Sequence, residues 1–198
     1  DPNLIKYVDV RGNDTFEFAT NSGTSFGHSS ANGAQGVAAA YYQNTPDFGT
    51  SPPLVESFSS FGDFPILFDT AGNRLPIPEQ RMRVDLTAPD GTENTFFGND
   101  RDGDGGPNFS GTSAAAPHAA GAAALLRDFD GSLTPAEVYA ALQSTAIDMD
   151  DPDQGGFQVG PDEKTGFGLI DVLAAVQSLG PADDFQPDNV ATNGTVAV

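Results

Sequence analysis

The order of apolar and polar positions along the chain predicts strands first and helices later. Apolar residues alternate in Leu4–Ala19, which we interpret as two strands joined by a turn. A short apolar run at Gln35–Tyr42 predicts a buried strand. Val55–Phe61 has the pattern of a strand or an extended segment, and Arg83–Ala88 that of a further strand. Pro89-Asp90-Gly91 is expected to end the last of these. We interpret this order as an α/β domain seen from its middle to its end.

Phe61–Glu79 is rich in Gly, Pro and Asp, so we expect it to be largely loop.

Three helices are predicted in the second half of the chain. The first helix is expected from about Thr112 to Leu126. Thr134, followed by Pro135 and by Glu137, predicts a capping box at the start of the second. The third is expected over Leu169–Leu179.

The stretch "NFSGTSAAAPHAAGAAALL", Asn108–Leu126, raises a question of chemistry. It is either a small-residue core helix that begins with hydroxyl side chains, or a helix that presents Ser113 as a nucleophile at its N-terminus. A helix N-terminus offers unpaired backbone N–H groups and a partial positive charge, which suit a developing oxyanion. Gly121 would be costly in an exposed helix, so we expect a neighbour packed closely against it and a helix buried on most sides.

Composition restricts the classes of partner. The chain has 198 residues, of which 28 are acidic and 8 basic, so its formal net charge is −20. This charge argues against binding to nucleic acid or to anionic membrane surfaces. No apolar run is long enough to insert into a membrane, and with no cysteine a cysteine zinc site is excluded.

Both ends of the chain have the character of internal sequence. The first residue is Asp1 rather than Met, and residues 181–198 are polar, acidic and contain proline, as linkers are. We therefore expect a piece of a larger protein. The organisation that we predict has residues 1–22 as the end of an inserted β segment, 23–180 as the main domain, and 181–198 as a linker or the start of a further domain.

Five segments, in order, resemble the subtilisin-like serine proteases. The strongest is "SGTSAAAPHAAGAAALL", which is similar to the family's Gly-Thr-Ser serine motif with its following Pro-His and small-residue helix. The others are "FGHSSANGAQGVAAA", "VESFSSFGD", "VDLTAPDG", which is similar to the family's Val-Asp-x-x-Ala-Pro-Gly segment, and "GFGLIDVLAAV". The chain is identified as the C-terminal part of such a catalytic domain, with a mostly parallel sheet flanked by helices.

The resemblance implies a serine endopeptidase that forms an acyl-enzyme on Ser113. It implies no required cofactor, protein or peptide substrates, and an extracellular or cell-surface location. The family's catalytic His and Asp contexts, "H-G-T" and "D-(S/T)-G", do not occur in this sequence. The resemblance therefore places the base and its Asp on sequence upstream, which makes the N-terminal part of the same protein a necessary partner.

Neither histidine of the chain is expected to serve as the base. His118 lies five positions after Ser113, about 140° around a helix by its ~100° per residue, and matches the family's Pro-His, whose role is structural. His28, in "GHSSANG", lacks the family's context and is interpreted as a packed or hydrogen-bonding side chain. Asn21 stands in a context superficially similar to that of the family's oxyanion-hole Asn, but it follows an alternating, polar strand pair, which favours a turn residue of an inserted β region. The backbone N–H of Ser113 is the one oxyanion donor that we can name.

An acidic segment just before the serine motif leaves two interpretations open. In "DRDGDG", Asp100, Asp102 and Asp104 alternate before a glycine, as carboxylates do in calcium loops. Gly111 stands where an EF-hand would have its twelfth-position Glu, which favours a solvated acidic loop over a structural calcium site.

Two other functions stay open at this point. A sedolisin-type serine-carboxyl peptidase shares a similar serine signature, although His118 argues against that family. A catalytically inactive subtilisin-like domain, acting as a binding or structural module, differs only in sequence upstream of Asp1.

Overall fold

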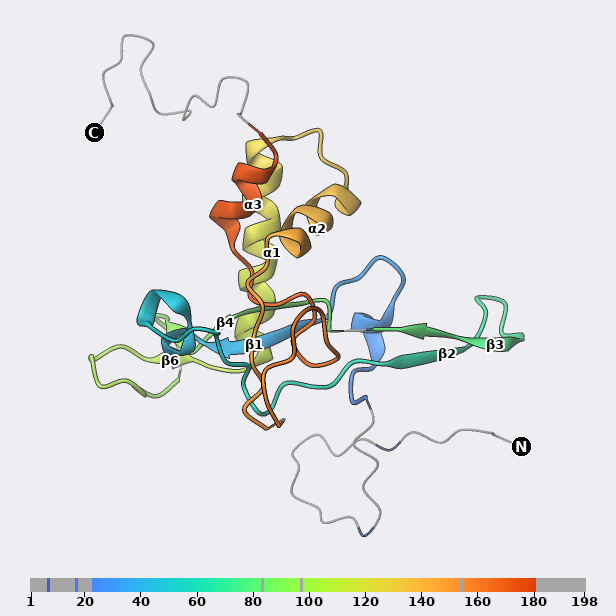
Figure 1. Cartoon of the computed structure of the whole chain (residues 1–198), viewed down its shortest axis with the longest axis horizontal. Coiled ribbons are helices and arrows are strands. Elements are labelled where there is room, and N and C mark those ends of the chain that lie inside the picture. The colour runs from blue at the N-terminus through green and yellow to red at the C-terminus, as the bar shows by residue number, and fades with distance from the viewer. Residues whose placement is uncertain are drawn as a thin grey trace.

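The computed structural model describes residues 7, 17, 23–82, 84–96, 98–153 and 155–180. Its centre is a parallel pair of strands, β1 (Val37–Tyr41) and β4 (Leu86–Asp90), with Val37 beside Leu86 and Tyr41 beside Asp90 (Figure 1). The strand predicted at Gln35–Tyr42 is confirmed, and β4 continues to Asp90 rather than ending at Ala88. The strands expected in Leu4–Ala19 and the linker 181–198 lie outside the described residues, apart from positions 7 and 17.

The three predicted helices are α1 (Thr112–Phe129), α2 (Pro135–Ser144) and α3 (Val172–Ser178). The capping box of α2 is confirmed: Thr134 Oγ1 accepts from the Glu137 amide at 3.3 Å, and Glu137 Oε2 accepts from the Thr134 amide at 2.8 Å. The third helix begins later than predicted because Leu169 is bridged to Thr87 and Ile147 in extended backbone. Three short 3₁₀ helices complete the helical elements of the described residues: η1 (Gly27–Ser30), η2 (Tyr42–Asn44) and η3 (Pro46–Phe48).

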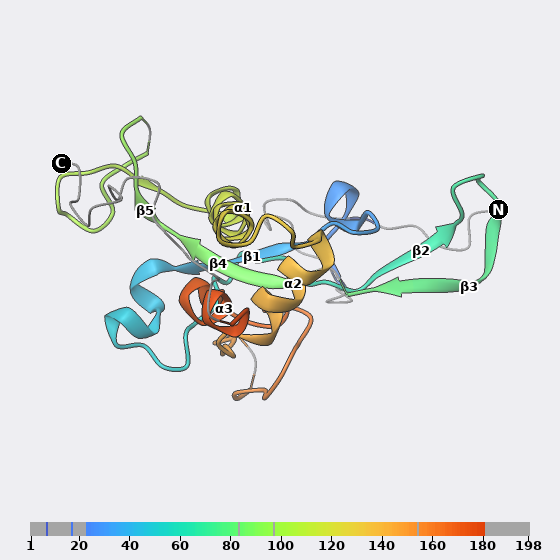
Figure 2. The ribbon, with the colours of Figure 1, turned by 90° about the horizontal axis from the view of Figure 1, so that it is seen from above.

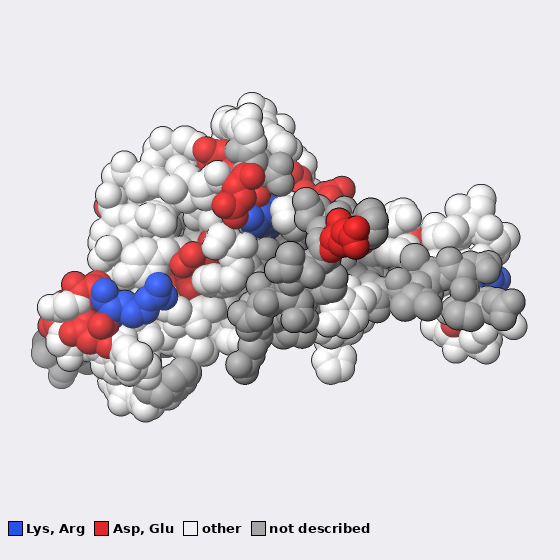
Figure 3. Space-filling model, turned by 90° about the horizontal axis from the view of Figure 1, so that it is seen from below, with Lys and Arg blue, Asp and Glu red and all other residues white. Residues whose placement is uncertain are grey.

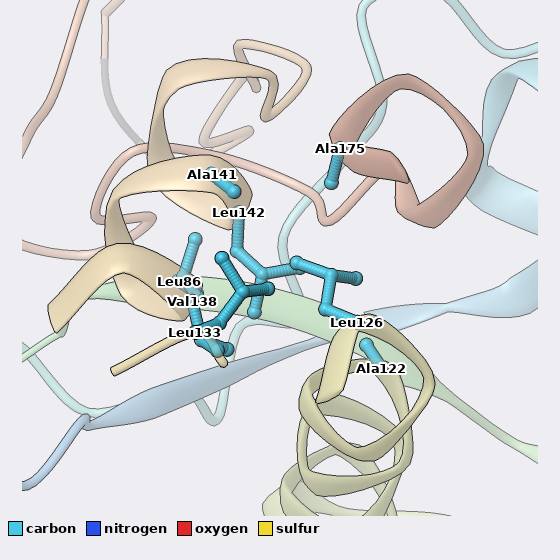
Figure 4. Close-up of a cluster of buried hydrophobic side chains, with 8 residues drawn as sticks. All are labelled: Leu86, Ala122, Leu126, Leu133, Val138, Ala141, Leu142 and Ala175. Atoms are coloured by element: carbon cyan, nitrogen blue, oxygen red, sulfur yellow. The ribbon is translucent and has the colours of Figure 1, made fainter. Parts of the chain in front are cut away.

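Small side chains allow α1 to approach the strand pair closely. Ala39 of β1 and Ala88 of β4 are fully buried against Ala115 and Ala119 of α1. Farther along α1, a larger cluster joins it to α2, α3 and β4 (Figure 4) and consists of Leu86, Ala122, Leu126, Leu133, Val138, Ala141, Leu142 and Ala175. The opposite face of the strands is buried by a third cluster that includes Val55, Met149 and Leu169. The strand pair is thus covered on both faces, as in an α/β domain.

The outer side of α1 differs from the expectation that this helix is buried on most sides. Gly121 is exposed, and a Cβ atom built there would meet nothing within 4 Å, so the expectation of a neighbour packed against Gly121 is wrong for the described residues. The buried residues of α1 form one stripe that faces the strands and α2, and among the described residues the side away from them is exposed.

The segment predicted as loop over Phe61–Glu79 contains an antiparallel hairpin instead. Its strands are β2 (Phe64–Phe68) and β3 (Arg74–Arg81), paired from Phe64 beside Arg81 to Phe68 beside Arg74, and it extends away from the body of the domain (Figure 2). The loop prediction is therefore wrong. Proline in β3 is tolerated because a two-stranded sheet needs hydrogen bonds on one side of each strand only.

Val55–Phe61, predicted as a strand or an extended segment, forms no strand of its own. This segment crosses the outer edge of β1 with single hydrogen bonds, from the Glu56 amide to Ala39 O at 2.8 Å and from the Ala39 amide to Ser59 Oγ at 3.0 Å. A turn from Glu56 to Ser59 interrupts this segment before it can pair with β1 as a strand.

The remaining strands of the described residues are the short pair β5 (Thr92–Glu93) and β6 (Asn108–Phe109). None of the described helices has the length and apolar character that crossing a lipid bilayer requires.

Candidate active site

Ser113 lies at the exposed start of α1. The helix N-cap is Gly111, with φ 112° and ψ 166°, and its carbonyl accepts from the Ala114 amide at 2.8 Å. This positive φ is a conformation that side chains other than glycine rarely adopt, so the sharp entry depends on glycine. Within the part of the chain that the structure describes, the Ser113 hydroxyl makes no hydrogen bond. The geometry therefore presents a free hydroxyl and the unpaired amides of a first helical turn at one point.

The loop that leads to Ser113 is fastened to the end of β4. The Gly91 amide donates to Phe109 O at 2.8 Å, and Asn108 Nδ2 donates to Gly91 O at 3.0 Å. The Gly111 amide donates to Asp90 Oδ2 at 2.6 Å. The sequence predicts that Pro89-Asp90-Gly91 ends a strand and that it belongs to a family-like segment, but not that Asp90 holds this loop. The available signal is the carboxylate before Gly91, where the similar segment of the family has Ala-Pro-Gly.

Neither histidine contacts the Ser113 hydroxyl. His118 Nδ1 bonds to Ala114 O at 2.8 Å, and its Nε2 lies 3.5 Å from Thr92 Oγ1, so its contacts join α1 to the residues after β4. His28 is an exposed residue of η1. Asn21, the oxyanion candidate, lies outside the described residues. The structure thus brings no imidazole to Ser113 within the ranges that it describes.

A cavity of about 300 Å³ opens beside the first turn of α1. Thr112 and Ala116 contribute one wall, the start of β1 at Val37 and Ala38 another, and the segment Thr24–Phe26 a third. A hollow of this size next to an exposed serine could admit a side chain of a bound peptide.

The three candidate metal-ligating carboxylates lie together. Asp100, Asp102 and Asp104 each offer an oxygen within 4.8 Å of the others. Asp102 Oδ2 accepts from Tyr42 Oη at 2.5 Å, which lowers the pKa of the Asp102 carboxyl, whereas its Oδ1 is buried without a partner among the described residues. Asp104, through a side-chain hydrogen bond and its charge, raises the pKa of Glu93. This donor set fits a hard divalent cation, which prefers carboxylate oxygens.

The wider surface is acidic. On the face shown in Figure 3, acidic side chains gather in several groups and basic side chains are few. This distribution agrees with the formal charge of −20.

A long apolar groove of about 560 Å³ follows the uncovered side of α1. Its walls include Pro117, Gly121 and Leu125 of α1 and Phe96 of the loop after β5. Leu125 is 57% exposed and Phe96 71% exposed. Apolar side chains of this groove are therefore open to solvent in the described part of the chain.

Comparison with known proteins shows to which family this chain is similar. A model of the subtilase family, Peptidase_S8, matches residues 11–168. Subtilisin from Bacillus pumilus is 33% identical over 110 residues, which cover 56% of this chain and 32% of that protein. Subtilisin E from Bacillus subtilis is also 33% identical over 110 residues, 23% of its length. The chain therefore spans about a third or less of these relatives. Among solved structures, fervidolysin from Fervidobacterium pennivorans is 24% identical, with a TM-score of 0.43, over 78% of this chain and 20% of that one.

Proposed function

Because the chain belongs to the subtilase family, whose model matches residues 11–168, we propose that it contributes the nucleophile of a serine endopeptidase. Ser113 Oγ attacks the carbonyl carbon of a peptide bond and loses its proton to a base. The carbon–nitrogen bond then breaks, the base returns the proton to the departing amine, and water hydrolyses the acyl-enzyme ester. The observation that carries this proposal is the exposed, unbonded Ser113 hydroxyl at the N-terminus of α1.

The proposal assigns the base and its carboxylate to sequence N-terminal to Asp1. His118 is engaged with Ala114 and Thr92, and His28 makes no bond to Ser113, so no described histidine is in place to accept the proton. The Ser113 amide, at the start of the helix, serves as one oxyanion donor, and aligned peptide dipoles strengthen it there.

The apolar groove along α1 supports the N-terminal part of the same protein as the partner of this chain. Burying Leu125 and Phe96 would remove apolar surface from water, and the exposed Gly121 would let a neighbouring segment approach the helix closely. The proposal includes protein or peptide substrates and an extracellular or cell-surface location, both taken from the resemblance.

Calcium at the acidic loop, Asp100–Gly105, stays a prediction. Bound there, the cation would neutralise repulsion among Asp100, Asp102, Asp104 and Glu93 and so stabilise the loop that precedes Asn108. No catalytic step requires it.

A fluorophosphonate probe, which phosphonylates an activated serine, tests the proposed activity in the full-length protein. The wild type should be labelled, Ser113→Ala should not, and Ser132→Ala, which removes an exposed serine beyond α1, should be labelled as the wild type is. The isolated 198-residue chain should not react, because it lacks the base. Labelling that survives Ser113→Ala would remove Ser113 from this role.

The same experiment separates the alternatives. A folded full-length protein that is never labelled would indicate a catalytically inactive domain that binds rather than cleaves. The sedolisin alternative predicts an activity that depends on a carboxyl base and is confined to acidic pH, whereas a histidine base predicts activity near neutral pH.

A further inference from the structure

Asp90, the last residue of β4, is a buried carboxylate aimed at the start of α1. Its side chain has no exposed surface, and its Oδ2 accepts the Gly111 amide at 2.6 Å. Gly111 is the N-cap of α1 and stands two residues before Ser113. A hydrogen bond from an amide to a carboxylate is shorter and stronger than one between neutral groups.

We propose that Asp90 is a positioning residue for the nucleophile: its carboxylate fixes the Gly111 amide and thereby the direction in which α1 presents Ser113. This inference rests on the peptidase function proposed above. It adds to that function a residue from outside the serine motif, on the strand against which α1 packs.

The point of attachment is a glycine, at which the backbone can rotate easily. Phe109 and Asn108 are held by Gly91, and Ser110 Oγ accepts from Arg101 Nη1 at 2.5 Å. The next residue, Gly111, has no side chain with which to be held, and glycine rotates more freely than any other residue. The bond to Asp90 removes that freedom immediately before the helix begins. Without an acceptor, the Gly111 amide would lose the partner that it has in the described structure.

Other charged groups interact with the Asp90 carboxylate, so the substitutions that test it must separate its charge from its role as a hydrogen-bond acceptor. Burial raises the pKa of Asp90, while the Gly111 amide, Arg101 and His118 lower it. The Asp90 charge in turn contributes to a raised pKa of Glu56, after burial. Since Oδ1 has no partner among the described residues, asparagine can place its carbonyl oxygen toward Gly111 and its NH₂ group at the position of Oδ1, which removes the charge and keeps the acceptor. Alanine removes both the charge and the acceptor.

The test compares Asp90→Ala and Asp90→Asn in the full-length protein. Asp85→Ala is the matched control, because Asp85 Oδ2 accepts the Gly36 amide at 2.7 Å just before β4 and at the far end of this strand from Ser113. Amide hydrogen exchange of the peptide 107–114 reports the loop directly. Peptide hydrolysis gives kcat and KM, and the fluorophosphonate probe gives the acylation rate.

Asp90→Ala should speed exchange in residues 107–114 and lower kcat about 10- to 100-fold, the effect expected of a nucleophile displaced by about 1 Å, with KM nearly unchanged. The kcat of Asp90→Asn should lie within about 3-fold of the wild-type value, because the acceptor is retained. Asp85→Ala should lower the melting temperature without changing kcat.

Three results would overturn the proposal: unchanged exchange in Asp90→Ala, an unchanged kcat despite faster exchange, or an Asp90→Asn variant as slow as Asp90→Ala. The last result would mean that the charge acts rather than the hydrogen bond. An unlabelled wild type would instead refute the peptidase function, and with it the catalytic consequence of the Asp90 bond. The exchange measurement would in that case still decide whether Asp90 holds the loop.

Discussion

Leu126→Ala should destabilise the domain by about 3–4 kcal/mol. Leu126 has no exposed surface and lies where α1 meets α2, α3 and β4. The substitution removes three buried carbons, which at about 0.8 kcal/mol each amounts to about 2.4 kcal/mol of lost transfer free energy. The cavity left behind adds to this, because the surrounding helices relax only in part. The neighbouring α2 is held by its own cap, which limits its movement into the space.

Urea unfolding followed by far-ultraviolet circular dichroism measures this loss. The full-length protein should carry Ser113→Ala throughout, so that self-digestion does not distort the transition. Leu173→Ala is the control, since Leu173 is a leucine of α3 that is 68% exposed, and it should cost under about 1 kcal/mol. A Leu126→Ala loss no larger than that of Leu173→Ala would refute the packing described for this cluster.

Three further predictions follow from the cap, the acidic loop and the groove. The Thr134 amide and hydroxyl hold the pKa of Glu137 below its ordinary value of 4.5, so the cap stabilises the fold above that pH and weakens as pH falls through the lowered value. Melting curves should accordingly show that Glu137→Ala lowers the melting temperature at pH 7 and loses this effect in acid. Millimolar calcium and molar NaCl should each raise the melting temperature over dilute EDTA buffer, and changing the three aspartates of the acidic loop to Asn should remove the calcium increment alone; calcium that still stabilises this variant would exclude the loop as its site. Leu125→Ala should destabilise the full-length protein by more than about 1 kcal/mol if the N-terminal part covers the groove, and a neutral effect in urea unfolding would show the groove open to solvent.

Elements with local signals were predicted well from the sequence. The start of α2 is decided by three neighbouring residues, Thr134, Pro135 and Glu137, and its cap forms as expected. The buried strand β1 is a short apolar run, and it was predicted as such. Ser113 was likewise selected by its immediate neighbours, and the structure presents it at a helix start.

Features that depend on distant partners were not predicted. Proline content suggested a loop where β2 and β3 pair, since the sequence did not reveal that each strand needs only one neighbour. Leu169 has a helical pattern, yet its bridges to Thr87 and Ile147 hold it extended. The bond from Asp90 to Gly111 joins residues 21 positions apart, and no local pattern announces it.

The β2–β3 hairpin has a consequence for how the chain closes on itself. The central strands are separated in sequence, and β1 and β4 can pair only after the chain between Tyr41 and Leu86 has formed a loop. Because Phe64 pairs with Arg81, the hairpin shortens the effective loop from roughly 45 to roughly 28 residues, which reduces the entropy lost on closure by about 0.4 kcal/mol. A hairpin also forms in microseconds, ahead of slower long-range pairing. The projecting hairpin therefore lengthens the chain between β1 and β4 without slowing their pairing in proportion, and β4 is the strand that carries Asp90.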